Sequence, residues 1–155
     1  AGIHFKGFIF FGLMVTNDGT YLLEYNMRLG DPETQVILPL MENNLLDVIL
    51  DCLEGKEIDL KFKDEKAVCL VMCSGGYPRQ IETGFEIKNL DKVKDSQILF
   101  AGASNSGDAI VTSGGRVLSI VATGDTFENA RKKVYDDALK IQFDYAFYRE
   151  DIGKF

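Results

Sequence analysis

The segment from Leu22 to Gln35 constrains this chain most, because its pattern predicts a strand that leads into a helix. Side chains alternate across a strand, so one apolar face and one face with polar groups are expected. The first would carry Leu23, Tyr25 and Met27, and the second Leu22, Glu24 and Asn26. Glu24 and Asn26 would then present a carboxylate and an amide carbonyl roughly 7 Å apart along the strand, which suits a hard cation such as Mg²⁺.

Charged residues follow this strand. Arg28 comes at the strand end and carries a permanent cation whose forked donors suit a phosphate. Asp31 is expected to cap a helix over residues 32–41, since Pro32 is tolerated at the first helical position. A helix N-terminus beside a metal-binding strand would favour an anion. Taken alone, however, Glu-x-Asn is also typical of a solvated strand face, and an arginine is typical of a surface ion pair.

The run from Glu24 to Gln35 resembles the metal-binding strand and following helix of the ATP-grasp ligases. Within that superfamily, Gly30-Asp31-Pro32-Glu33 resembles the phosphoribosylamine-glycine ligase family, the glycinamide ribonucleotide synthetases of purine synthesis. Three later blocks follow in the order of that family, namely Ser74–Pro78, Thr112–Leu118 and Tyr148–Gly153. The chain therefore resembles the C-terminal part of such a ligase over most of its length.

The resemblance implies roles for five residues. Glu24 and Asn26 would hold Mg²⁺ or Mn²⁺ that bridges the terminal phosphates of ATP, and Arg28 would stabilise the phosphoryl group in transfer. Asp31 and Glu33 would either orient the amine or glycine, or simply cap and favour the helix N-terminus. The implied reaction joins glycine to 5-phosphoribosylamine through glycyl phosphate, so the protein has to position the reactants and neutralise crowded negative charge.

The family's amino-terminal domain, its earlier ATP-grasp strands and the lysines that clamp adenine and phosphates would all precede residue 1. We therefore expect a monomer whose partner is the missing N-terminal part of the same enzyme, and no activity from this chain by itself. Two alternatives stay open. One is another ATP-grasp carboxylate-amine ligase with a different acid or amine, and the other is a non-catalytic binding or assembly module.

Charge and composition argue against several other classes. The net charge of −7 and the pI near 4.7 give no basic footprint for nucleic acid or an anionic membrane. No apolar run approaches the ~18 residues of a membrane span. Three cysteines without framework spacing indicate reduced thiols and a cytoplasmic protein. The only histidine is His4, so no Ser/His/Asp or Cys/His nucleophile set is expected.

The fold class predicted is α+β, in two parts. Residues 1–56 would form the C-terminal part of an ATP-grasp domain, with strands over 8–16 and 21–27 joined by a hairpin turn at Asn17-Asp18-Gly19. Gly7 and Gly12 predict a close backbone approach or a bulge rather than a nucleotide loop. A helix capped by Asn43-Asn44 and ended by Gly55 would follow.

Residues 57–155 would form the C-terminal domain, a small mixed, mainly antiparallel β lobe with one long helix. Strands are expected over 67–73, 85–87, 97–101, 109–112 and 116–122, with a hairpin turn at 113–115. Asp125–Glu128 resembles a capping box before a helix whose apolar stripe, Phe127, Ala130, Val134, Ala138 and Ile141, would face the core. Ser74–Pro78 is either a loop with exposed N–H groups or just a tight turn. Arg149 would meet a substrate phosphate or pair with a nearby acid.

Overall fold

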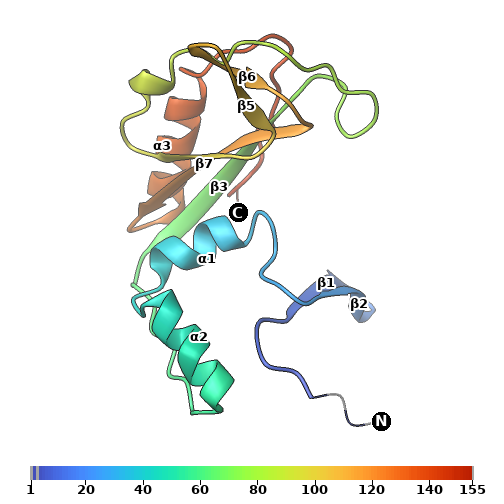
Figure 1. The fold of residues 1–155 in the computed structure, drawn as a ribbon, viewed down its shortest axis with the longest axis vertical. Helices are drawn as coiled ribbons and strands as arrows, with labels where there is room; N and C mark the ends of the chain where they lie inside the picture. Colours follow the sequence, from blue (N-terminus) through green and yellow to red (C-terminus); the bar gives the residue numbers. More distant parts are fainter. Residues whose placement is uncertain (1, 3, 155) are drawn as a thin grey trace. The chain divides into compact units, whose positions relative to one another are not determined.

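The computed structural model describes residue 2 and residues 4–154, and the chain divides into two compact units. Unit 1 comprises Ala1–Thr34 and Met41–Lys63, and unit 2 comprises Gln35–Leu40 and Asp64–Phe155. Figure 1 shows the order of the elements along the chain. Within the described part of the chain, no helix combines the length and the apolar character that crossing a membrane requires.

Unit 1 begins with the predicted β-hairpin. Strands β1 (Phe10–Thr16) and β2 (Gly19–Asn26) pair antiparallel, and the register ends with Thr16 opposite Gly19, so a two-residue turn joins them. Figure 1 shows the two strands side by side. The hairpin prediction is confirmed, with β1 starting two residues later than expected.

The hairpin also contains the bulge that Gly12 suggested. Gly12 pairs with Glu24, but the next pair is Leu13 with Leu22, so Leu23 is an extra residue on β2. Paired residues share a face of the hairpin, and Leu13 alternates with Gly12. Leu22 therefore lies on the face opposite Glu24, and the expectation that the two share a face is wrong because the bulge resets the alternation.

Helix α2 (Leu45–Glu54) has the ends that the sequence predicts. The Asn44 side chain accepts a hydrogen bond from Leu46 N, and Gly55 ends the helix in the left-handed conformation at φ 76°. On this helix, Val48 is the buried residue.

Helix α1 (Thr34–Leu40) is shorter than predicted. Residues 31–33 form a turn, and Thr34 closes it by donating its backbone N–H to Gly30 O at 3.0 Å and its hydroxyl to the same oxygen at 2.5 Å. The helix therefore begins three residues after Asp31. The predictions that Asp31 caps it and that Pro32 is its first residue are wrong.

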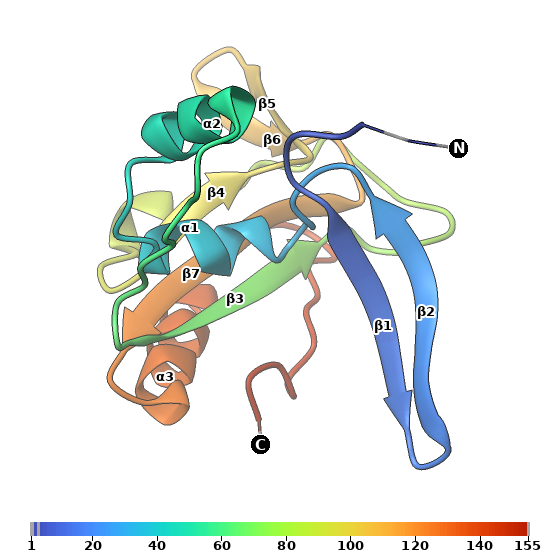
Figure 2. The same ribbon diagram turned by 90° about the horizontal axis from the view of Figure 1, so that it is seen from below.

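Unit 2 is built on antiparallel strands. They are β3 (Lys66–Cys73), β4 (Gln97–Phe100), β5 (Ala103–Ser106), β6 (Ala109–Thr112) and β7 (Arg116–Gly124). One sheet has the order β3-β7-β4, and β5 pairs with β6 in a second sheet. Figure 2 shows α3 behind the three-stranded sheet and α1 in front of it. The predicted α+β class with mainly antiparallel strands is confirmed.

Two local predictions in unit 2 are wrong. Residues 113–115 do not close a hairpin, because β6 pairs with β5 while β7 pairs with β3 and β4. Ser113 N and Gly114 N instead donate to Gly102 O at 2.7 and 3.1 Å, which ties this turn to another segment. Residues 85–87 make only an isolated bridge from Glu86 to Val111 rather than a strand. Strand β5, with the polar sequence Ala-Ser-Asn-Ser, was not predicted.

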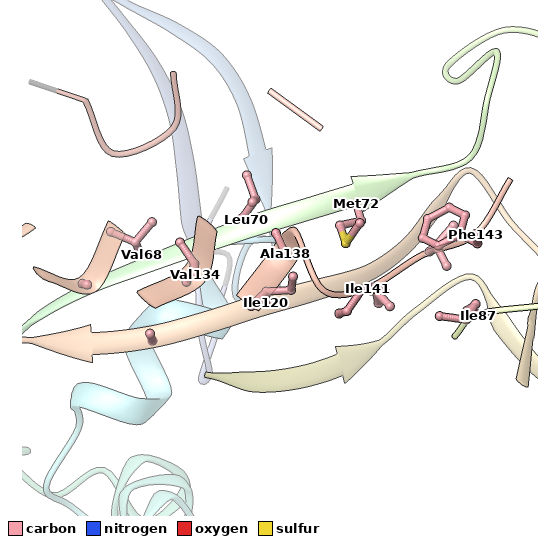
Figure 3. Close-up of a cluster of buried hydrophobic side chains, with 13 residues drawn as sticks. Val68, Leu70, Met72, Ile87, Ile120, Val134, Ala138, Ile141 and Phe143 are labelled. Carbon is pink, nitrogen blue, oxygen red and sulfur yellow. The ribbon is translucent and has the colours of Figure 1, made fainter. Parts of the chain in front are cut away.

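The core of unit 2 lies between the three-stranded sheet and α3 (Phe127–Ala138). Figure 3 shows Leu70 and Met72 of β3, Ile120 of β7 and Val134 of α3 in this cluster. The apolar stripe of α3 is confirmed as core, except that Phe127 is 37% exposed. The cap is Thr126, whose hydroxyl accepts from Asn129 N at 3.1 Å, so the predicted capping box starts one residue too early.

A buried carboxylate ties the loop before β4 to α3. Asp137 is fully buried and accepts hydrogen bonds from Lys94 N at 3.3 Å and Asp95 N at 3.0 Å. Lys140 Nζ lies 2.6 Å from the same carboxylate. Burial disfavours the ionised form, but these hydrogen bonds outweigh it and hold the pKa of Asp137 below its ordinary value.

The C-terminal segment docks on α3, as predicted. Tyr135 donates its hydroxyl proton to Arg149 O at 2.7 Å and accepts from Ile152 N at 3.1 Å. Arg131 Nε donates to Ile152 O at 3.0 Å. Of the two roles considered for Arg149, the structure shows the ion pair, since Nε and Nη2 lie 2.9 and 2.6 Å from the two carboxylate oxygens of Asp151.

Candidate functional site

Glu24 and Asn26 lie on one face at the end of β2. Asn26 Nδ2 donates a hydrogen bond of 2.9 Å to Glu24 Oε1, so the two side chains meet. The Glu24 residue is exposed and Asn26 is half-buried. The geometric prediction that the two share a face is therefore confirmed, and the metal-binding role stays a prediction.

These two side chains fit a hard divalent cation. A carboxylate and an amide both offer oxygen ligands, which Mg²⁺ prefers over nitrogen or sulfur. Within the described residues, no group of three or more His, Cys, Asp or Glu side chains could hold a metal ion. The pair would therefore supply two protein ligands and leave the other positions to water and phosphate oxygens, as is usual for Mg²⁺ at nucleotides.

The backbone of β1 passes directly beneath Glu24. Gly12 pairs with Glu24 in the hairpin, and a Cβ at Gly12 would lie 2.8 Å from Glu24 Cγ. The glycine at position 12 predicts a close backbone approach or a bulge, but the sequence does not reveal that Glu24 is the side chain that lies against it. The register of the two strands, including the position of the bulge, places Glu24 opposite Gly12.

Arg28 lies just beyond β2, and its Nη1 donates a hydrogen bond of 2.8 Å to Leu29 O rather than to the Glu24 carboxylate. It also lines a cavity of about 730 Å³ within unit 1. Lys6 is the other charged residue of this lining, which is otherwise mainly apolar and includes neither Glu24 nor Asn26. The structure thus places Arg28, the residue predicted to bind phosphate, just after β2, but in a cavity that Glu24 and Asn26 do not line.

Asp31 and Glu33 lie in the turn before α1. The Glu33 carboxylate folds back over Gly30, where an added Cβ would lie 2.2 Å from Oε2. Asp31 is exposed and does not cap α1. Helix α1 has seven residues and begins at Thr34, so residues 31–33 separate its first residue from the end of β2 in the sequence, and the anion site expected at its N-terminus stays a prediction. The possible contacts of Asp31 and Glu33 with substrates stay predictions.

Two of the later sequence blocks meet in unit 2. Ser74 is buried, its hydroxyl donates to Gly114 O at 2.8 Å, and its N–H donates to Gly115 O at 2.8 Å. Tyr77 N donates to Ser74 O at 3.3 Å, which is the tight-turn alternative considered for this loop. The turns 74–78 and 113–115 are thus held together by hydrogen bonds, although they are distant in the sequence.

A carboxylate-amide pair on a strand with an arginine just beyond it is the arrangement expected for the ATP-grasp class. Family models agree with this and are more specific. Residues 67–155 match "Phosphoribosylglycinamide synthetase, C domain", and residues 1–34 match "Phosphoribosylglycinamide synthetase, ATP-grasp (A) domain". The chain belongs to the phosphoribosylglycinamide synthetase family.

Individual relatives carry the same description. The chain is 47% identical over 154 residues to a phosphoribosylamine-glycine ligase of Caldanaerobacter subterraneus subsp. tengcongensis, covering 98% of this chain and 37% of the relative. It is 47% identical over 152 residues to that of Clostridium acetobutylicum, with coverage of 97% and 36%. The chain therefore spans little more than a third of the length of these relatives.

A solved structure supports the same fold. The crystal structure of the phosphoribosylamine-glycine ligase from Thermotoga maritima is similar with a TM-score of 0.80 and 38% identity. The similarity covers 92% of this chain and 36% of that chain. The α+β architecture of both units is therefore found in a protein of the same family.

Proposed function

We propose that this chain is the C-terminal portion of a phosphoribosylamine-glycine ligase. The complete ligase would join glycine to 5-phosphoribosylamine, giving glycinamide ribonucleotide, ADP and phosphate, in de novo purine synthesis. The observation that carries the proposal is the Glu24–Asn26 pair, which meets on one face of a strand within the segment matching the ATP-grasp domain.

The reaction would proceed in two displacements. A carboxylate oxygen of glycine attacks the γ-phosphorus of ATP, the bond to the β-γ bridging oxygen breaks, and ADP leaves. The amine nitrogen of phosphoribosylamine then attacks the carbonyl carbon of glycyl phosphate, inorganic phosphate leaves, and the nitrogen loses a proton. Both steps crowd anionic oxygens together, so positioning and charge neutralisation are the main tasks of the protein.

In this proposal, Glu24 and Asn26 hold Mg²⁺ or Mn²⁺. The bound cation would neutralise charge on the terminal phosphates of ATP. Arg28 donates hydrogen bonds to the phosphoryl group in transfer, for which its guanidinium is suited by charge and by its forked N–H groups. Asp31 and Glu33 orient glycine or the amine, or serve only the local turn.

The remaining parts of the proposal concern the context of the chain. Residues 1–56 would belong to the ATP-grasp domain and residues 57–155 to the C-terminal domain. The N-terminal part of the ligase would supply the adenine-binding strands and the phosphate-binding lysines, so this chain is inactive by itself. We further propose a cytoplasmic, monomeric enzyme, with no nucleic-acid or membrane partner.

The decisive experiment measures ADP release that depends on glycine and phosphoribosylamine in the complete ligase. Glu24→Ala is expected to lower kcat by about 10²- to 10³-fold, because removing one preorganised stabiliser of developing charge typically costs that much. Glu42→Ala, which removes an exposed carboxylate elsewhere in unit 1, is the matched control and should keep wild-type turnover.

Two results would contradict the proposal. Unchanged turnover after Glu24→Ala would favour a non-catalytic module, and a preference for another acid or amine in substrate profiling would favour a different carboxylate-amine ligase. The prediction of inactivity is tested separately on the 155-residue chain. Glycine-dependent ADP release from this chain by itself would refute it.

A further inference from the structure

Strand β1 has a glycine, Gly12, at the position where any larger residue would collide with the Glu24 side chain. In the register of the hairpin, Gly12 of β1 pairs with Glu24 of β2, immediately before the bulge at Leu23. Bulges are common next to functional sites, where they change the direction of a side chain. The absence of a Cβ at residue 12 therefore occurs at the β1 position that pairs with Glu24, the carboxylate of the two proposed metal ligands.

The space above Gly12 is filled by Glu24. A Cβ built on Gly12 would lie 2.8 Å from Glu24 Cγ, 3.6 Å from Oε1 and 3.7 Å from Cδ. The atom that collides is Cγ, which is next to the backbone-attached Cβ and cannot move aside as the far end of a long side chain can. A methyl group at residue 12 would force the whole Glu24 side chain into another rotamer.

Moving Glu24 would also separate it from Asn26. The hydrogen bond from Asn26 Nδ2 to Glu24 Oε1 is 2.9 Å long in the present arrangement. Gly12 is not among the glycines with positive φ, so its backbone conformation is open to alanine. The effect of an added methyl group is therefore expected on the Glu24 side chain rather than on the path of β1.

We propose that Gly12 is a positioning residue for the Glu24 carboxylate, because its missing side chain leaves the space in which Glu24 lies across β1 and meets Asn26. This inference rests on the proposed function, in which Glu24 and Asn26 are the metal ligands. Gly12 touches neither substrate nor metal in this scheme and acts only through Glu24.

The test measures metal binding as well as turnover in the complete ligase. Mn²⁺ is titrated in the presence of ATP, and free Mn²⁺ is followed by electron paramagnetic resonance. Gly12→Ala is expected to weaken Mn²⁺ binding by about 10- to 100-fold, the usual cost of losing a group that orients a metal ligand. Turnover should recover at high metal concentration. Val15→Ala, on the same strand and 75% exposed, should leave both quantities unchanged.

A second readout uses the 155-residue chain itself. The side-chain amide of Asn26 gives its own nuclear magnetic resonance signals, whose position and proton exchange report the hydrogen bond to Glu24. These signals should shift in Gly12→Ala and remain unchanged in Val15→Ala. An unchanged Asn26 amide together with wild-type Mn²⁺ affinity in Gly12→Ala would overturn the proposal.

The double variant Gly12→Ala/Glu24→Ala separates a local collision from general misfolding. With Cγ of residue 24 removed, the methyl group at residue 12 has no collision to make, so the double variant should match Glu24→Ala in Mn²⁺ affinity and in melting temperature. If Gly12→Ala prevents folding and the double variant folds, the collision is supported. If the double variant is also unfolded, the proposal fails.

The same series distinguishes this inference from the proposed function. If Glu24→Ala leaves Mn²⁺ affinity and turnover intact, the metal-binding assignment itself is wrong. If Glu24→Ala weakens both and Gly12→Ala weakens neither, the assignment of Glu24 stands and only the positioning role of Gly12 is refuted.

Discussion

The two units of this chain differ in how much apolar surface they bury. Among the described residues, Val48 is the one buried hydrophobic residue of unit 1, whereas all the others belong to unit 2. The hairpin of unit 1 exposes large apolar side chains on both strands, including Leu13 and Val15 of β1 and Leu23 and Tyr25 of β2. The unit that carries the candidate chemistry is thus the one with the less complete core.

The difference in buried apolar surface predicts a difference in stability between the two units. In unit 2, a helix and a three-stranded sheet bury a shared cluster, which is a sufficient arrangement for a small domain. In unit 1, two strands pair with each other, and a two-stranded hairpin is marginally stable in water without further packing. Unit 2 should therefore be the more stable unit when each is judged by its own packing.

Hydrogen exchange tests this comparison most directly and should show the largest effect. Backbone amides of β3 and β7 are expected to exchange about a thousandfold more slowly than those of β1 and β2. Core amides open only with global unfolding, which for typical domains costs about 5–15 kcal/mol, whereas exposed hairpins open locally. Equal protection in the two units, measured by mass spectrometry or nuclear magnetic resonance, would contradict the comparison.

Matched leucine truncations sharpen the same contrast. Leu70→Ala removes a fully buried side chain of β3 and is expected to lower the free energy of unfolding by about 2–5 kcal/mol. Leu23→Ala removes a side chain of β2 that is 62% exposed, and it should change the free energy of unfolding by less than about 0.5 kcal/mol. Chemical denaturation of both variants provides the measurement. A larger loss from Leu23→Ala would show that the hairpin contributes more than its exposure indicates.

Asp137 provides a polar test of unit 2. Asp137→Asn is expected to lower the free energy of unfolding by about 2–4 kcal/mol. The buried carboxylate accepts hydrogen bonds from Lys94 N and Asp95 N and pairs with Lys140, and a neutral amide cannot replace it in all three interactions. Denaturant unfolding at neutral pH measures this loss. Asp136→Asn, one residue away on the exposed side of α3, is the control and should have a far smaller effect.

The pH dependence of the same group has a defined sign. The pKa of Asp137 is lower in the folded protein than its ordinary value of 3.8, so the folded state favours the ionised form. Its contribution to stability is fully present above the unfolded pKa and is lost as the pH falls below that value and through the folded pKa. Acid destabilisation below about pH 4 should thus be weaker in Asp137→Asn than in the wild type. An unchanged acid limb would contradict this assignment.

The sequence predicted best the elements in which local and long-range preferences agree. Asn44 and Gly55 mark the ends of α2, and the apolar run of β3 is a strand, because caps and apolar periodicity act within a few residues. The Glu24–Asn26 pair was predicted for the same reason, since adjacent alternate positions on a strand share a face. These predictions required no knowledge of the partner strands.

Two of the features that were missed depend on pairing between distant segments, and a third depends on a local turn. Leu22 changes face because of a bulge, and only the register with β1 reveals where it lies. The turn at 113–115 connects β6 of one sheet to β7 of the other instead of closing a hairpin, and its N–H groups donate to Gly102 O. Asp31 looked like a cap, but the hydrogen bonds from Thr34 to Gly30 set the start of α1. In the first two positions, pairing with a distant segment decides the structure, and in the third a hydrogen-bonded turn takes the place of the expected cap.

The C-terminal segment gives the smallest expected effect. The segment is held on α3 by the Tyr135 hydroxyl, which donates to Arg149 O and accepts from Ile152 N. Tyr135→Phe leaves the ring packed and removes only these two hydrogen bonds. It should therefore lower the free energy of unfolding by about 1 kcal/mol and make residues 148–154 more sensitive to proteolysis. Arg149→Ala removes an exposed ion pair with Asp151 and should leave the melting temperature unchanged. If Arg149→Ala instead releases the segment and Tyr135→Phe does not, the ion pair rather than the tyrosine hydroxyl holds it, and the segment would depend on surface charge instead of on α3.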